Sequence, residues 1–226
     1  MKGYTRIFPD RTVAGRELGA ALAQRKFAAP PIVLGLPRGG VPVAFEVAAA
    51  LHAPLDVMVV RKVGMPGQPE LAVGAIASGN IVVRDPDTLR YMPDGGAGFD
   101  ALAARERVEL ERRERAFRGD RPPLDLKGRT VILVDDGIAT GSTMLAAVRA
   151  ARQAGATHVI AAAPVSSHEA AALLGAEADE VQFLLVPPAL YAIGQWYEVF
   201  DQTPDAEVCR LLALNPPPRP SPPPGA

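Results

Sequence analysis

The chain has 226 residues, of which 48% are hydrophobic and 22% are charged, and a formal net charge of −1 at pH 7; these values allow one α/β domain with a sizeable core or at most two small domains. The charge balance excludes an extensive basic surface, so neither nucleic acid nor a membrane is expected as a partner. A single cysteine, Cys209, excludes an internal disulfide, and the lack of a signal-peptide core or an apolar run of about 18 residues predicts a cytoplasmic protein.

Short apolar runs alternate with helical patterns along the first part of the chain. Asp10 is a suitable cap for a helix that runs to about residue 24. Residues 32–36 and 55–60 are predicted as buried strands, with a helix at 41–51 between them. Further on, the segments 74–78 and 81–84 flank a Gly79-Asn80 turn, which is the pattern of a hairpin.

The second part of the chain continues this alternation. Residues 100–118 carry Glu–Arg pairs at i,i+4 spacing, which predicts an exposed helix that ends at Gly119. Thr203-Pro204 is predicted to cap a last helix that reaches residue 214, and the proline-rich residues 215–226 are predicted to be a disordered tail. The other predicted elements are strands at 130–134, 158–165 and 180–186 and helices at 142–154 and about 169–174.

Strands that alternate with helices favour an α/β fold with a mostly parallel sheet flanked by helices. Ligands of such sheets bind beyond the carboxyl ends of the strands. The loops that follow residues 36, 60, 134, 165 and 186 are therefore the expected positions of a site.

The segment 131–143, VILVDDGIATGST, combines a buried strand, two acids and a loop of small residues at a helix start. Amides and hydroxyls of that loop can bind a phosphate, and the helix N-terminus favours the anion. The acids Asp135 and Asp136 would repel the phosphate but can accept hydrogen bonds from the ribose hydroxyls of the same ligand. An alternative is that Asp136 only caps the helix while Asp135 is solvated. The phosphate-loop candidates are Ala139, Thr140, Gly141, Ser142 and Thr143.

This segment resembles the phosphoribosyl-pyrophosphate motif of type I phosphoribosyltransferases. Other phosphate motifs fit worse, because Gly137 and Gly141 are too close for a Walker A loop, no lysine follows, and no G-x-G-x-x-G is present. The resemblance covers residues 31–186. It implies transfer of a 5-phosphoribosyl group from phosphoribosyl pyrophosphate to a nitrogen acceptor, with release of pyrophosphate and with Mg2+ held mainly through the phosphoribosyl pyrophosphate rather than directly by the protein.

The resemblance also implies a pyrophosphate loop at residues 35–42, GLPRGGVP, where Arg38, Gly39 and Gly40 lie at a strand-to-helix junction. The family commonly has a non-proline cis peptide in this loop, so the resemblance implies one between Pro37 and Arg38. The alternative is an ordinary turn. Similar enzymes place basic residues near pyrophosphate after the second strand, which is the position of Arg61 and Lys62; these could instead be a solvated strand end.

The family places a mobile hood between the second strand and the phosphoribosyl-pyrophosphate motif, so we expect the insertion at 63–120 to form a helical lid. Its first part, residues 64–70, has the composition of a flexible linker, and the charged helix could equally be a solvated decoration. A C-terminal hood should follow the last strand, where Tyr191, Trp196 and Tyr197 could stack on a flat acceptor or belong to the core or an interface. Residues 1–214 should form one domain, and a homodimer is possible.

The acceptor is constrained at one position. Family members that act on 6-oxopurines usually carry Asp where this chain has Ala139, so such an acceptor is disfavoured. Without that acid, Glu70 in the lid is a candidate proton acceptor. Arg38, Arg61 and Lys62, which would share the charge of the leaving group, favour catalysis. The alternative is a non-catalytic module that binds phosphoribosyl pyrophosphate or a nucleotide; a hydrolase based on Ser167-His168 lacks the nucleophile elbow.

Overall fold

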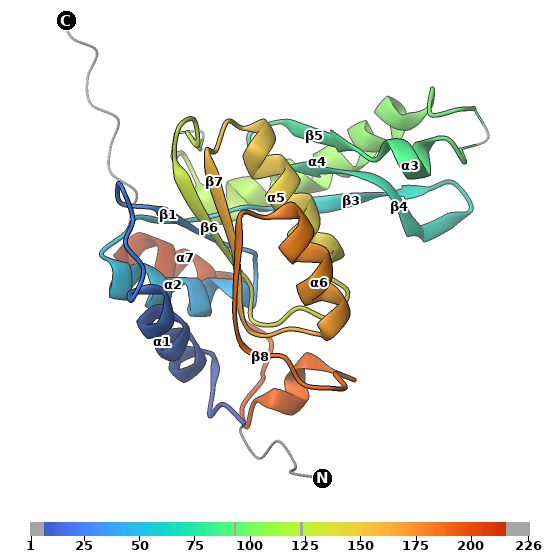
Figure 1. Ribbon diagram of the computed structural model, residues 1–226. Coiled ribbons are helices and arrows are strands. Elements are labelled where there is room, and N and C mark those ends of the chain that lie inside the picture. The colour runs from blue at the N-terminus through green and yellow to red at the C-terminus, as the bar shows by residue number, and fades with distance from the viewer. Residues whose placement is uncertain (1–6, 93, 123, 216–226) are drawn as a thin grey trace, which may run out of the picture.

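The computed structural model describes residues 7–92, 94–122 and 124–215 and is built around a parallel sheet (Figure 1). The five strands lie in the order β2-β1-β6-β7-β8. All but β8 are buried along almost their whole length, as expected for a sheet covered on both faces. Their bounds are Ile32–Gly35 for β1, Leu55–Val57 for β2, Thr130–Val134 for β6, His158–Val165 for β7 and Glu180–Leu185 for β8.

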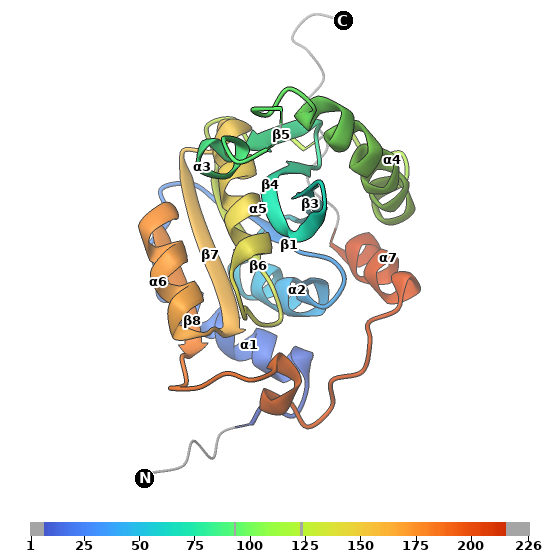
Figure 2. The same cartoon turned by 90° about the vertical axis from the view of Figure 1, so that its right-hand side faces the viewer.

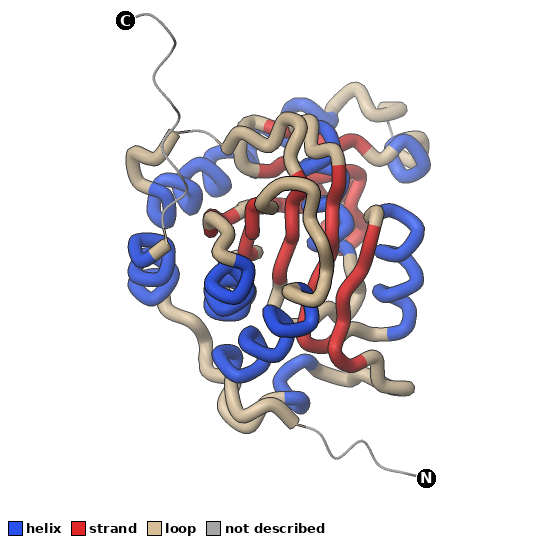
Figure 3. Tube along the Cα trace, turned by 60° about the vertical axis from the view of Figure 1, so that its left-hand side comes forward, coloured by secondary structure: helices blue, strands red, loops and turns tan. Residues whose placement is uncertain are grey.

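Helices cover both faces of this sheet, so the predicted fold class is confirmed (Figures 1 and 3). One face carries α1 (Arg11–Leu22), α2 (Gly40–Leu51) and α7 (Asp205–Leu214). The other carries α5 (Ser142–Gln153) and α6 (His168–Glu177). The α5 helix packs closely because its buried positions are mostly alanines.

The strand register places three chain segments at one edge of the sheet. Gly35, the last residue of β1, pairs with Val57 on one side and with Val134 on the other. The loops after β1, β2 and β6 therefore leave the sheet side by side. This is the edge at which a parallel sheet binds ligands.

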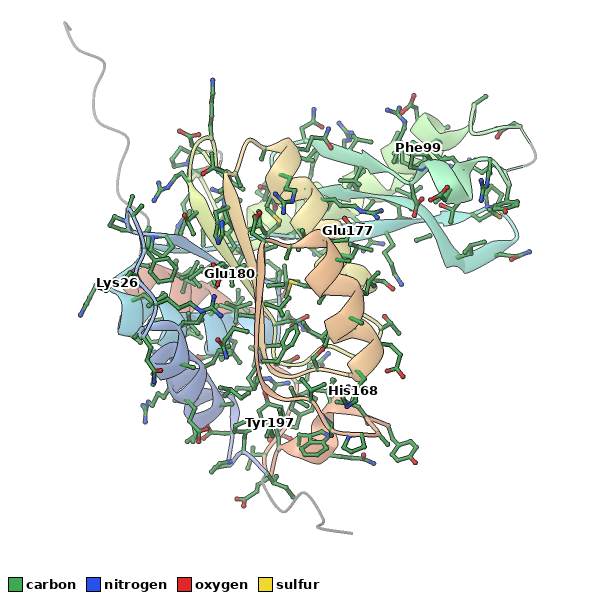
Figure 4. All side chains as sticks on the ribbon, viewed as in Figure 1. Lys26, Phe99, His168, Glu177, Glu180 and Tyr197 are labelled. Atoms are coloured by element: carbon green, nitrogen blue, oxygen red, sulfur yellow. The ribbon has the colours of Figure 1, made fainter. Side chains whose placement is uncertain are left out.

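The insertion forms a β-arm as well as a helix. Three antiparallel strands, β3 (Val60–Met65), β4 (Gln68–Ala77) and β5 (Ile81–Arg84), project from the sheet (Figure 1). The long helix α4 (Phe99–Arg118) lies on one side of the arm and α5 on the other (Figure 2). At the start of α4, the Phe99 ring packs so closely on Gly74 that a Cβ there would lie 2.7 Å from it; Phe99 is labelled in Figure 4.

Two sequence predictions in this region are wrong, and one short helix was missed. Residues 64–70 are not a linker, because Gly67, with a φ of 79°, closes the turn between β3 and β4. The strand predicted at 55–60 is divided between β2 of the main sheet and β3 of the arm. Between β5 and α4, a short helix, α3 (Pro86–Leu89), was not predicted.

A buried ion pair fastens the insertion to the main sheet. Asp56 of β2 is fully buried, and Arg118 at the end of α4 donates to both of its oxygens, with Nε–Oδ1 at 3.0 Å and Nη2–Oδ2 at 3.1 Å. Arg121 donates from Nη2 to the carbonyl oxygen of Leu212, 2.6 Å away in α7. The far end of α4 is thus held by β2 and α7 together.

The C-terminal segment crosses back over the site edge. A 3-10 helix at Ile193–Trp196 follows β8, and Phe8 donates from its backbone N–H to the carbonyl oxygen of Trp196. The N-cap of α7 is Pro204 and not Thr203, whose side chain is buried and makes no capping bond. Of the predicted tail, residues 216–226 lie outside the described residues. None of the helices in the described part of the chain combines the length and apolar character that crossing a membrane requires.

Candidate functional site

The loop after β6 brings the two acids and the small residues to the site edge. Gly141 is the N-cap of α5 and has a φ of 77°, in the left-handed region that favours glycine. A Cβ on Gly141 would also lie 3.2 Å from the Cβ of Ala170 in α6. Because the residue before the helix can turn this sharply, the chain passes directly from the acids to a helix N-terminus.

The helix start in this loop offers unused backbone donors. Leu145 makes the first intrahelical bond, to the carbonyl oxygen of Gly141. Ser142 N–H reaches only the Thr140 hydroxyl, at 3.4 Å, and that hydroxyl lies 3.1 Å from the Ser142 Oγ. Within the described chain, the amides of Thr140, Gly141 and Thr143 have no protein acceptor. Converging free amides at a helix start are suited to a phosphate group.

Asp136 is held by two segments that are far away in the sequence. Its Oδ2 accepts a hydrogen bond from Arg11 Nε at 2.8 Å, and its carboxylate is 14% exposed. Its backbone carbonyl accepts a 2.6 Å bond from the Tyr197 hydroxyl, which belongs to the C-terminal segment (Figure 4). The Arg11 guanidinium also lies over the Phe200 ring, 4.0 Å from its centroid. Asp136 is therefore not a helix cap, and the alternative that it only caps α5 is wrong.

Burial and mutual repulsion shape the protonation of the two acids. Burial raises the pKa of Asp135 well above its ordinary value, and the charge of Asp136 raises it further. Burial also raises the pKa of Asp136, while the hydrogen bond and charge of Arg11 act in the opposite direction. Asp135 Oδ1 additionally accepts the Asp136 backbone N–H at 2.9 Å. Two neighbouring buried carboxylates, whose ionisation is energetically unfavourable, are typical of a binding site when they lie at the end of a strand.

The loop after β1 lies directly against these acids. The peptide between Pro37 and Arg38 is cis, as predicted. A Cβ on Gly39 would lie 2.0 Å from Asp136 Oδ2, and a Cβ on Gly40 would lie 2.5 Å from the carbonyl oxygen of Val134. Only glycine fits these two positions, so the pyrophosphate-loop candidate and the acid pair form one continuous surface.

The three basic candidates lie in different surroundings. Arg38 forms an ion pair with Asp205, with Nη1–Oδ1 at 3.3 Å. Arg61 and Lys62 lie inside β3, so the prediction that they end a core strand is wrong. Because they are adjacent in a strand, their side chains point to opposite faces. Arg61 bonds to Glu106 of α4, with Nε–Oε2 at 2.7 Å.

Lys62 lies on the other side of the arm. It lines a cavity of about 260 Å³ that also includes Ser142 at the start of α5. Of the two basic residues in β3, Lys62 is therefore the one that faces the phosphate-loop candidate.

Comparison with known proteins agrees with this geometry. Residues 13–183 match the family model of the phosphoribosyl transferase domain. The chain belongs to this family. The matched range contains the Arg38 loop, the β-arm, the acid pair and the start of α5.

Close relatives of this phosphoribosyl transferase domain include two proteins of Mycobacterium tuberculosis, from strains CDC 1551 and H37Rv, each named "putative phosphoribosyl transferase". Each is 48% identical over 207 residues, which is 92% of this chain and 46% of the relative. The chain thus spans about half the length of these relatives. The crystal structure of TT1426 from Thermus thermophilus is 45% identical, has a TM-score of 0.85, and covers 92% of this chain and 99% of that chain.

The aromatic candidates of the phosphoribosyl transferase domain differ in their surroundings. Tyr191 is 87% exposed, whereas Trp196 is partly buried and packs against a cluster that contains Phe8 and Tyr197. The Tyr191 side chain is thus accessible to solvent, whereas Trp196 packs within the C-terminal segment.

Sequence reasoning missed Arg11 and considered Tyr197 only as a residue that could stack on the acceptor; both contact Asp136, from opposite ends of the chain. Neither carries a local motif; the one available signal for Arg11 was a cation directly after the Asp10 cap. Sequence reasoning also considered Ser167 as a nucleophile, although no nucleophile elbow surrounds it. The structure uses this side chain as the N-cap of α6, and its hydroxyl donates to the carbonyl oxygen of Ala139 at 2.7 Å.

Proposed function

We propose that this domain binds phosphoribosyl pyrophosphate with Mg2+ and transfers its phosphoribosyl group to a nitrogen acceptor, with release of pyrophosphate. The observation that carries the proposal is the set of free amides of Thr140, Gly141 and Thr143 in the loop that follows Asp135 and Asp136. A sugar phosphate needs both parts, since the phosphate seeks donors and the ribose hydroxyls seek acceptors.

In this proposal the 5′-phosphate binds at the start of α5 and the ribose hydroxyls donate to the acid pair. Arg11 bonds to Oδ2 of Asp136, which leaves other lone pairs of the carboxylate for a hydroxyl. Arg11 also opposes the rise in the pKa of Asp136 and so favours its ionised form. A carboxylate beside the ribose would stabilise the positive charge that develops on the ring as the bond to pyrophosphate breaks.

The leaving pyrophosphate would lie at the loop of Arg38, whereas Lys62, which lines the cavity beside Ser142, would lie nearer the 5′-phosphate. No group of three metal-ligating side chains gathers among the residues that the structure describes. In this proposal the Mg2+ ion is bound mainly by oxygens of the phosphoribosyl pyrophosphate. When bound, the ion stabilises the negative charge of the departing pyrophosphate.

Ala139 and the hood bear on the acceptor. Ala139 is exposed at the site and offers no acid for the ring nitrogen of a 6-oxopurine, so that class of acceptor is disfavoured. The exposed Tyr191 could stack on a flat base. Glu70 is the candidate proton acceptor, and its side chain lies outside the described part of the structure.

The direct test measures pyrophosphate release from phosphoribosyl pyrophosphate and Mg2+ in the presence of a panel of nucleobases and amines. Release with at least one acceptor supports the transferase. Tight binding without turnover on any acceptor would favour the alternative, a non-catalytic module that binds phosphoribosyl pyrophosphate or a nucleotide.

Asp136→Asn tests the ribose assignment. The variant should weaken binding of phosphoribosyl pyrophosphate about tenfold or more, because it loses a charge-assisted hydrogen bond worth about 1.5–3 kcal/mol. It should remain folded, since the Tyr197 bond to the backbone of residue 136 is kept. Asp87→Asn, an exposed acid in α3, is the matched control. Equal affinity of Asp136→Asn and the wild type, measured by titration calorimetry, would count against the assignment.

A further inference from the structure

A small cavity lies where three elements meet: the loop after β1, helix α4 and the start of α7. Its volume is about 190 Å³. Helices α4 and α7 run next to each other on this side of the molecule (Figure 2). The cavity is lined by Pro37, Arg38, Arg112, Arg113, Phe117 and Asp205.

Three guanidinium groups share this cavity with a single carboxylate. Asp205 contacts Arg38 at 3.3 Å, in a pair whose side chains are 37% and 58% exposed. On α4, Glu109 holds both neighbouring arginines, with Arg112 Nε at 2.7 Å and Arg113 Nε at 2.8 Å. Glu109 does not line the cavity itself, so the lining carries an excess of positive charge.

We propose that Arg38, Arg112 and Arg113 form a binding site for the pyrophosphate group, and that the Asp205 carboxylate competes for it in the free protein. The inference rests on the proposed function, since Arg38 belongs to the loop that would take the leaving group. It extends that function to the inserted helix, which contributes Arg112 and Arg113 to the same anion.

The geometry fits a compact anion. Guanidinium groups bind phosphate oxygens in a bidentate manner, and several of them suit a group with many oxygens. A volume of 190 Å³ is below the roughly 300–1,000 Å³ typical of pockets for larger organic ligands, which favours an inorganic phosphate group. The single exposed contact of Asp205 with Arg38 is weak enough for such an anion to replace it.

The competition predicts that two substitutions act in opposite directions. Asp205→Asn removes the competing carboxylate and should tighten binding of inorganic pyrophosphate about fivefold, whereas Arg112→Gln should weaken it about fivefold. Glu207→Gln is the matched control, because Glu207 lies in the same first turn of α7 but pairs with Arg210 outside the cavity. Its affinity should equal that of the wild type.

Titration calorimetry with inorganic pyrophosphate on the full chain provides the measurement, and thermal melts verify that each variant is folded. Unchanged or weaker binding by Asp205→Asn would overturn the proposal. Unchanged binding by Arg112→Gln would overturn it as well, because the inserted helix would then have no part in the site.

Titrations with phosphoribosyl pyrophosphate and ribose 5-phosphate distinguish a site for the pyrophosphate group of the substrate from a site for the free product. If the site takes the pyrophosphate group of the substrate, Asp205→Asn should tighten phosphoribosyl pyrophosphate as well, whereas a site for the free product alone affects only inorganic pyrophosphate. Ribose 5-phosphate should respond to neither substitution, and an equal change with it would show a general charge effect and refute the site. The two proposals fail separately: titration of Asp136→Asn with phosphoribosyl pyrophosphate reports on the acid pair, whereas titration of the Asp205 and Arg112 variants with inorganic pyrophosphate reports on this cavity, which Asp136 does not line.

Discussion

Gly39→Ala tests whether the Arg38 loop and the acid pair form one surface. The new Cβ would lie 2.0 Å from Asp136 Oδ2 and 2.7 Å from its Cγ, whereas ordinary Cβ contacts begin near 3.4 Å. The loop or the carboxylate must therefore move by about 1.4 Å, the difference between 3.4 and 2.0 Å. The carboxylate cannot turn away freely because Arg11 holds it at 2.8 Å. A displacement of this size at a binding loop is expected to lower kcat/KM about 100-fold, or ~2.7 kcal/mol.

The assay for Gly39→Ala combines pyrophosphate release with calorimetric titration of phosphoribosyl pyrophosphate. The fold should survive, because the substitution strains one loop at the edge of the sheet and loses at most a bond worth ~1–3 kcal/mol. Gly175→Ala is the control: it lies in α6, a Cβ there meets nothing within 4 Å, and it should stabilise the protein by ~0.5–1 kcal/mol without affecting activity. Wild-type affinity and turnover in Gly39→Ala would refute the reasoning.

Two further predictions concern the charges that hold the site. Arg118→Met should lower the free energy of unfolding by ~3–5 kcal/mol in a denaturant titration, because it leaves fully buried Asp56 without its bidentate partner; a loss below ~1 kcal/mol would contradict this account. Asp135→Asn should raise the melting temperature at pH 7.5 but not at pH 3. The folded-state pKa of Asp135 is raised, so its contribution to stability is present below the unfolded pKa of about 3.9 and is lost as the pH rises through the folded-state value. A melting difference that is the same at both pH values would contradict the assigned cause.

The parallel core was predictable because its signals are local. A run such as residues 131–134 is apolar without interruption, and a strand buried on both faces requires this. The left-handed conformation of Gly141 followed from the loop sequence, since glycine favours such a φ, whereas the cis peptide between Pro37 and Arg38 was expected only from the family resemblance.

The first part of the β-arm was predicted to be a linker because its turn residues are compatible with both a linker and a tight turn. Pro66 and Gly67 are as common in linkers as in tight turns, and only the pairing of Val63 with Gly74 decides between them. That pairing is supported by Phe99, which lies 25 positions further along and packs on Gly74. The same pairing places Arg61 and Lys62 on opposite faces of the arm, which a strand ending at residue 60 could not indicate.

The site combines residues inside the range that matches the family model with residues outside it, and Asp136 contacts both. The free amides, the acids and the Gly39 loop all lie within the matched range 13–183, and they would bind the ligand common to the family. Arg11 and Tyr197, which hold the side chain and the carbonyl of Asp136, lie just outside that range at either end. The C-terminal segment that carries Tyr197 also contains the exposed Tyr191. Because Arg11 and Tyr197 meet on the residue that would face the reacting ribose, we expect differences in acceptor choice between relatives to arise in the segments that carry them as well as at Ala139.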